Sequence, residues 1–167
     1  MVAVTAIVVL GSAIGTRGLR RQLTAERRYE QAIAAYMNQQ PQRSLELFED
    51  VAEEFSDLPV GALCQLKVAF LLYADHGNLQ QAESLFRAYL DTHPKTVFFV
   101  ADSPVAEYEG ELELIAYYFL GRIAQDRGNL TQARRWFDKI VNAGSRNPGN
   151  YIVSEAKSAV REMASEG

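Results

Sequence analysis

One ten-residue phrase occurs twice in this chain. Residues 77–86 read GNLQQAESLF and residues 128–137 read GNLTQARRWF, so six residue types return at the same places 51 residues apart. Internal repetition is the sequence mark of stacked helical arrays, in which each repeat packs on its neighbours. Such arrays mostly present binding surfaces for other proteins, so the phrase bears on function as well as on fold.

Composition sets limits on the class of protein. A chain of 167 residues is long enough for one domain with its own core. The net charge of −4 argues against nucleic acid, which needs a basic surface. One cysteine and two histidines offer no internal disulfide and no cluster of metal ligands.

Apolar residues recur with helical spacing from Ala25 onward, and glycine or proline ends most of these runs. Ser103 and Pro104 have the residue types that favour a helix N-terminus. Since no stretch favours a sheet, the prediction is an all-α fold. The expected helices cover residues 25–37, 44–55, 61–73, 79–90, 104–128, 130–141 and 151–164.

The helix pairs resemble tetratricopeptide repeats (TPR), whose pattern runs over 34 residues. The second repeat, 63–96, matches at Leu66, Ala69, Phe70, Tyr73, Ala82, Phe86, Tyr89 and Pro94. The third, 114–147, carries Tyr117, Leu120, Gly121, Ala124, Ala133, Phe137, Ile140 and Ser145. The first, 25–58, is degenerate and carries Arg28, Gln31, Ala32, Ala35, Ser44, Phe48, Val51 and Ser56. The resemblance implies a TPR-like domain over 25–167, with three helix pairs and a capping helix at 151–164.

In the TPR family the first helix of each pair lines a concave groove that holds a partner protein. The resemblance carries this role to Tyr29, Ile33 and Tyr36, to Lys67, Leu71 and Ala74, and to Tyr118, Arg122 and Gln125. No asparagine occupies the positions that members binding C-terminal carboxylates use, so that mode of recognition is not expected. The alternative is that the three tyrosines only pack between repeats.

The N-terminus has a different character from the rest of the chain. Residues 1–16 hold no charged side chain, and five arginines crowd the next dozen positions. A secretory signal would place its basic residues before the apolar run, and none is found there. A buried helix or strand is one alternative, because 16 residues fall short of the roughly 20 that span a bilayer.

The preferred interpretation of residues 1–24 is a short membrane segment followed by a basic flank. Its apolar core includes Val8, Val9, Leu10 and Ile14. The arginines then favour a cytoplasmic location for the remaining chain, with a periplasmic location as the alternative. A short apolar N-terminus before a few such repeats is similar to membrane-anchored bacterial envelope proteins of the TPR superfamily.

The connector between the second and third repeats is long and holds four consecutive apolar residues, Val97, Phe98, Phe99 and Val100. Long connectors in compact folds tend to be functional or mobile. These residues either tuck under the domain or contact a partner or a membrane.

The sequence predicts a non-enzymatic adaptor, tethered to a membrane, that holds a partner protein in its groove. No catalytic set of side chains and no phosphate-binding glycine loop is found, and no cofactor, metal or small-molecule substrate is expected. The alternative is a structural accessory subunit, whose N-terminal helix packs permanently among the helices of a membrane complex. Gly11 and Gly15 have the spacing that lets membrane helices approach closely.

Overall fold

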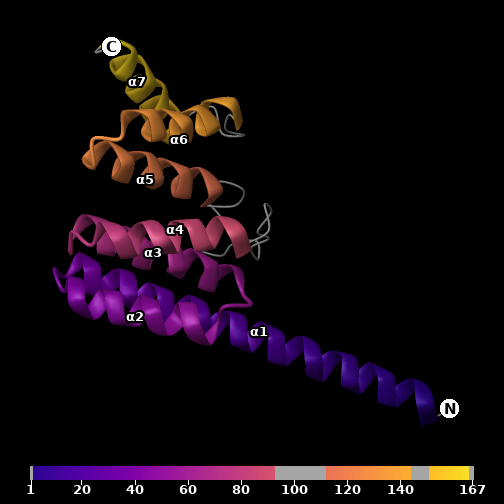
Figure 1. Cartoon of the computed structure of the whole chain (residues 1–167). Helices are drawn as coiled ribbons and strands as arrows, with labels where there is room; N and C mark the ends of the chain where they lie inside the picture. Colours follow the sequence, from indigo (N-terminus) through magenta and orange to yellow (C-terminus); the bar gives the residue numbers. More distant parts are fainter. Residues whose placement is uncertain (1, 93–111, 144–150, 166–167) are drawn as a thin grey trace. The chain divides into compact units, whose positions relative to one another are not determined.

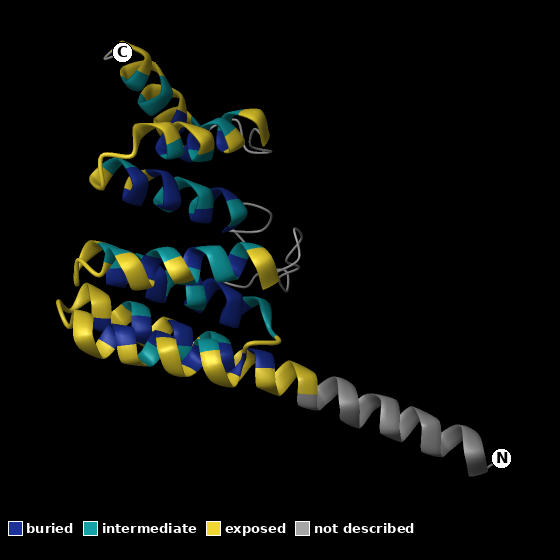
Figure 2. Ribbon diagram, viewed as in Figure 1, coloured by how far each residue is buried: buried dark blue, intermediate teal, exposed yellow. Residues whose placement is uncertain are grey.

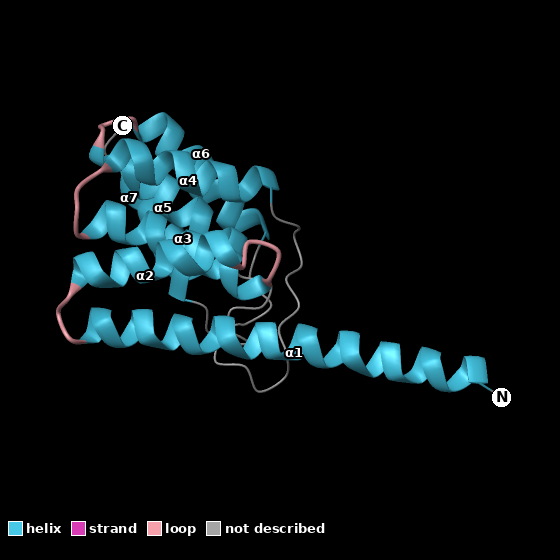
Figure 3. Cartoon of the chain, turned by 90° about the horizontal axis from the view of Figure 1, so that it is seen from below, coloured by secondary structure: helices cyan, strands magenta, loops and turns pink. Residues whose placement is uncertain are grey.

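The structure, a computed structural model, describes residues 2–92, 112–143 and 151–165, with side chains from Gly18 onward. In these ranges every regular element is a helix and no strand occurs, so the all-α prediction is confirmed (Figures 1 and 3). The helices are α1 (Val2–Met37), α2 (Pro41–Glu54), α3 (Pro59–Ala74), α4 (Leu79–Thr92), α5 (Leu112–Asp126), α6 (Leu130–Ala143) and α7 (Tyr151–Ser165).

Two predicted boundaries need comment. The predicted segment 1–24 and the start of the domain predicted from residue 25 lie in one helix, α1, which runs from Val2 to Met37. The division at residue 24 stays a prediction. Thr24 and Ala25 contain no helix breaker, so nothing in the local sequence stops the helix there. The long helix predicted from Pro104 is described only from Leu112, and its first turns lie outside the described residues.

The chain forms two compact units, Met1–Cys64 and Gln65–Gly167, which are treated separately below. In the first unit α1 packs along α2. The ring of Tyr29 lies 5.8 Å from that of Phe48, and the buried Ser44 hydroxyl donates to the backbone carbonyl of Ala32 at 2.9 Å. Because a buried hydroxyl needs a partner, this hydrogen bond fixes how the two helices meet.

Two arginines of α1 reinforce the same pair. Arg21 forms an ion pair with Asp57, and Arg28 forms one with Glu54. Both guanidinium groups also lie over the ring of Phe55, at 5.5 and 5.7 Å. The hydrogen bond from Arg21 holds the pKa of Asp57 below its usual value. All four charged groups are largely exposed, so each ion pair contributes little to stability on its own.

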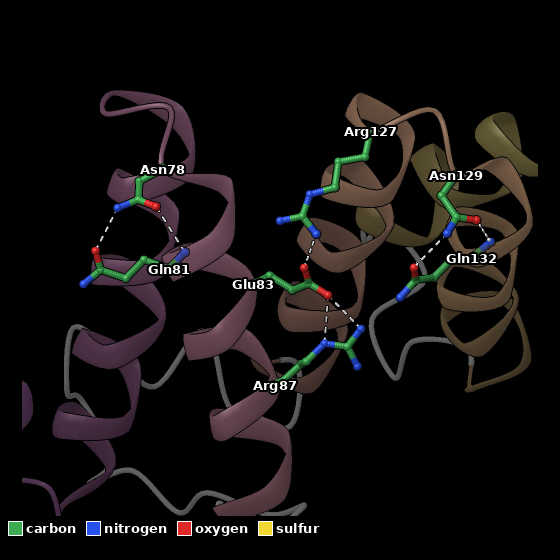
Figure 4. Close-up of polar contacts among 7 residues, drawn as sticks. All are labelled: Asn78, Gln81, Glu83, Arg87, Arg127, Asn129 and Gln132. Carbon is green, nitrogen blue, oxygen red and sulfur yellow. Dashed lines mark hydrogen bonds and ion pairs between the residues drawn. The ribbon is translucent and has the colours of Figure 1, made fainter.

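In the second unit, the repeated phrase forms the same helix-turn-helix junction twice. Gly77 and Gly128 adopt φ of +62° and +72°, the left-handed conformation that glycine accepts at a helix C-terminus. Each following asparagine caps the next helix, because Asn78 Oδ1 accepts from the Gln81 backbone and Asn129 Oδ1 accepts from Gln132, at 3.2 and 3.0 Å. The amide of each asparagine also donates to that glutamine's side chain (Figure 4).

Aromatic rings fill the space where α3, α4 and α5 meet. The ring of Phe119 on α5 lies 5.3 Å from Phe70, 5.6 Å from Tyr73 and 5.4 Å from Phe86. An ion-pair network joins α4 to the end of α5, since Glu83 pairs with both Arg87 and Arg127 (Figure 4). Burial opposes the ionisation of Glu83, but hydrogen bonds from the two arginines outweigh it and lower the pKa of this carboxyl.

The core of α5, α6 and α7 is centred on Phe137, which is fully buried. A Cβ atom on Gly121 would lie only 2.6 Å from Cε1 of this ring, so glycine is needed for the ring to fit against α5. From α7, Ile152 and Ala156 complete the cluster. Figure 2 shows buried positions in dark blue along α5 and α6. The core thereby fixes which faces of α5 and α7 lie beside each other.

Candidate partner-binding site

A cavity of about 300 Å³ lies between α5 and α7. Each helix contributes one face to it, because the lining residues on each recur at spacings of three and four. They are Tyr118, Arg122, Gln125 and Asp126 on α5, and Glu155, Ser158, Ala159 and Glu162 on α7.

Tyr118 forms the aromatic wall of the cavity. Its ring is partly exposed and is held from behind by Phe119 and Phe137, with ring centres 5.3 and 6.0 Å away. Arg122 is exposed one helical turn further on, and its Nη1 donates to the Tyr118 hydroxyl at a long 3.5 Å. Since this contact is at the limit of a hydrogen bond, the guanidinium keeps most of its donors for another group.

Carboxylates dominate the charge of the cavity. One guanidinium, that of Arg122, faces three carboxylates, those of Asp126, Glu155 and Glu162. Ser158 donates a hydrogen bond to Glu162 at 3.0 Å. Counted over its described lining residues, the cavity is thus a polar site with a negative balance and a single cation.

Asp126 is also tied to the core of the unit. The hydroxyl of Tyr73 donates to Asp126 Oδ2 at 2.8 Å. Burial and then this hydrogen bond raise the pKa of Tyr73 to about 12, so its hydroxyl stays a donor at neutral pH. The carboxylate of Asp126 is therefore oriented by a neutral phenol at one side of the cavity.

The structure brings together three of the residues that the TPR resemblance had assigned to a groove. Tyr118, Arg122 and Gln125 line the same cavity. Tyr29 and Leu71 need correction as partner contacts, since they are 5% and 2% exposed and belong to the core. Helical spacing shows which residues share a face of a helix, but it cannot show whether other side chains cover that face.

The remaining residues predicted to line the groove differ in how exposed they are. Tyr36 and Ala74 are exposed, while Ile33 and Lys67 are partly exposed. None of them lines the cavity between α5 and α7.

The sequence interpretation missed the contribution of α7. Glu155, Ser158 and Glu162 were not singled out, although their spacing places them on one face of the last helix. The last helix was interpreted as a cap. Because a capping helix is expected to have one polar, exposed face, the polar residues on that face were not considered as part of a site. The charged stripe was the feature that could have identified the second wall.

Two predicted regions are not described. Val97, Phe98, Phe99 and Val100 lie outside the described residues. Val8, Val9, Leu10 and Ile14 belong to the helical backbone of α1, but their side chains are not described. Among the residues whose side chains are described, from Gly18 onward, no helix is long and apolar enough to cross a bilayer, and no group of three or more His, Cys, Asp or Glu side chains is placed to hold a metal ion.

Comparison with protein-family models, with curated proteins and with solved structures finds no match to this chain.

Proposed function

We propose that this chain is a non-enzymatic, protein-binding module built from TPR-like helix pairs, and that the cavity between α5 and α7 receives part of a partner protein. One observation carries the proposal: Tyr118, Arg122 and Gln125, which the TPR pattern assigns to partner binding, line one cavity. Tyrosine and arginine are favoured anchors in interfaces because they combine a large contact area with polar groups.

The size and polarity of the cavity favour a protein partner over a small molecule. Its volume of about 300 Å³ is at the lower end for ligand pockets, and such pockets are mostly apolar. The charged lining of this cavity instead suits a side chain that a partner inserts from its surface. The preformed helices reduce the ordering that binding requires on this side of the interface.

The N-terminal segment is proposed to tether this module to a membrane, with the rest of the chain in the cytoplasm or, alternatively, in the periplasm. The second candidate function is a structural accessory subunit of a membrane complex. The unbroken helix α1 favours this second function, because a continuous helix fixes the orientation of its N-terminal end relative to the part of α1 that packs on α2. An adaptor binds its partner reversibly, whereas an accessory subunit stays in its complex.

The test is to purify the full chain in mild detergent and identify co-purifying proteins by mass spectrometry. Arg122→Glu reverses the one cation among the described lining residues of the cavity, and Arg134→Glu, on the exposed surface of α6, is the matched control. We expect a partner to accompany the wild type and the Arg134→Glu chain and to be lost from the Arg122→Glu chain. A salt-sensitive partner indicates an adaptor, and a stoichiometric, salt-resistant set of membrane proteins indicates a subunit.

The cavity hypothesis would have to be abandoned if the same partner came with Arg122→Glu in equal yield. Circular dichroism of all three chains controls for folding.

A further inference from the structure

Two leucines of α1 are exposed side by side. Leu19 and Leu23 are 52% and 53% exposed and lie one helical turn apart, so they share one side of the helix. They fall in the exposed part of α1 that Figure 2 colours yellow, directly after the undescribed side chains. In an ordinary soluble pair of helices, neighbouring leucines at this spacing would point into the core.

The four arginines around these leucines whose side chains are described divide into two groups. Arg21 and Arg28 are held by Asp57 and Glu54 and by the ring of Phe55. For Arg20 and Arg27, both exposed, no hydrogen bond or ion pair of the guanidinium is found within the described part of the chain. The second group is thus available to anions from outside.

Gly18 begins the part of α1 whose side chains are described, and it has no close neighbour. A Cβ atom on Gly18 would meet no atom within 4 Å, although the next turns on this side carry the buried Gln22 and Ala25. The helix itself continues without a break to Val2. The exposed leucines therefore lie beside an open position of α1, directly after 15 uncharged residues, 2–16, and Arg17.

Helix length makes a lipid bilayer the fitting occupant of this face. At about 1.5 Å per residue, residues 2–16 cover only about 22 Å. Continued to Leu23 on the leucine side, the apolar length reaches about 33 Å, which matches a hydrocarbon core of about 30 Å. Arginine side chains at such a boundary reach outward to the headgroups.

We propose that α1 enters an anionic bilayer with its Leu19–Leu23 side facing the acyl chains, while Arg20 and Arg27 contact lipid phosphates. This inference rests on the proposed membrane tether and adds its depth, its lipid-facing side and its preference for anionic lipid. Each basic residue near an anionic surface strengthens attachment severalfold.

The test uses the full chain in nanodiscs of phosphatidylglycerol and phosphatidylcholine. Cys64, which is buried, is replaced by alanine, and single cysteines at Leu19→Cys, Leu23→Cys, Thr24→Cys or Met37→Cys carry a fluorescent bimane label. Met37 is the matched control, because it is an apolar residue of the same helix and is 75% exposed. Thr24 is the control for the side of the helix.

We expect nitroxide lipids to quench the labels at 19 and 23. The iodide quenching constants of these two labels should be at least fivefold lower than that of the label at 37. The label at 24 should be more open to iodide than the label at 23. Arg20→Gln with Arg27→Gln should reduce attachment to phosphatidylglycerol vesicles about tenfold or more, with little change on pure phosphatidylcholine.

Iodide quenching at 19 and 23 equal to that at 37 would overturn this inference. If the chain still floats with vesicles in that case, the tether itself survives and only its lipid-facing side is wrong. If the chain does not float at all, the tether and this inference both fail, while the cavity test with Arg122→Glu is unaffected. Protection at 19 and 23 without lipid, together with a dimeric mass, would assign the face to a second copy and also overturn the inference.

Discussion

The pair α3–α4 and the pair α5–α6 repeat one set of residues and differ in another, and the two sets serve different purposes. The repeated residues form the hairpin: a left-handed glycine, an asparagine cap with its glutamine, and the fully buried Ala82 or Ala133 and Phe86 or Phe137. The residues that differ decide what each pair faces. Leu71 is buried, whereas Arg122 at the equivalent place lines the cavity.

This comparison shows that the repetition itself says little about the binding site. Phe86 stacks on Phe119 of the following helix, and Phe137 packs with Ile152 and Ala156 of α7. Each phenylalanine thus joins its pair to the next element, as expected for an array in which repeats contact their neighbours. In the function proposed here, recognition depends on positions where the two pairs carry different residues, such as Leu71 and Arg122.

The largest expected effect tests whether the two phenylalanines are equivalent. Phe86→Ala and Phe137→Ala should each lower the free energy of unfolding by about 3–5 kcal/mol, because both rings are fully buried. Urea denaturation followed by circular dichroism measures both. A loss under about 1 kcal/mol for either variant would show that the pairs are not equivalent and that the repeat register is misplaced.

The next largest loss of stability is expected at a position where the two pairs differ. The first pair has Phe70 there, and the second has Gly121. Gly121→Ala should cost about 1–3 kcal/mol, because its Cβ would overlap the ring of Phe137. Thermal unfolding measures the loss, and Gly18→Ala, whose Cβ meets no atom, is the control. Combining Gly121→Ala with Phe137→Leu should cost less than the sum of the two single changes. Strict additivity would mean that the close approach is unimportant.

The caps should have a smaller and equal effect in both pairs. Asn78→Ala and Asn129→Ala each remove a side-chain acceptor for a helix N–H group and should cost about 1 kcal/mol. Replacement by aspartate keeps the acceptor and serves as the control. Unequal losses in denaturation would show that the identical junctions differ in their dependence on the cap.

The smallest effect concerns Arg127, which forms an ion pair with Glu83 of α4 and stands where the first pair has His76. Arg127→Gln removes one partner of Glu83 and should cost less than about 1 kcal/mol near neutral pH. Because the pKa of Glu83 is lowered on folding, its contribution is present above the unfolded pKa and disappears as pH falls through the folded value. The two chains should therefore become equally stable in acid. A difference that persists when Glu83 is protonated would assign the effect to packing.

Much of the fold follows from local sequence. The helices expected at 79–90, 130–141 and 151–164 correspond to α4, α6 and α7 within two residues at each end, because glycine, asparagine and helical spacing mark them. The cavity was only half predictable. Its α5 wall came from the TPR pattern, whereas its α7 wall depends on how Phe137, Ile152 and Ala156 pack, which no local signal specifies.

The unbroken course of α1 has a rotational consequence. A flexible linker would let the N-terminal segment rotate freely relative to α2. A continuous helix instead fixes this angle, because Tyr29, Ala32 and Ser44 hold the later turns of α1 against α2. One residue inserted ahead of Leu19 would turn everything before it by about 100° relative to α2. The rotation of α1 about its axis, as much as its length, therefore determines which side of the helix pair α1–α2 faces the structure that anchors the N-terminal end.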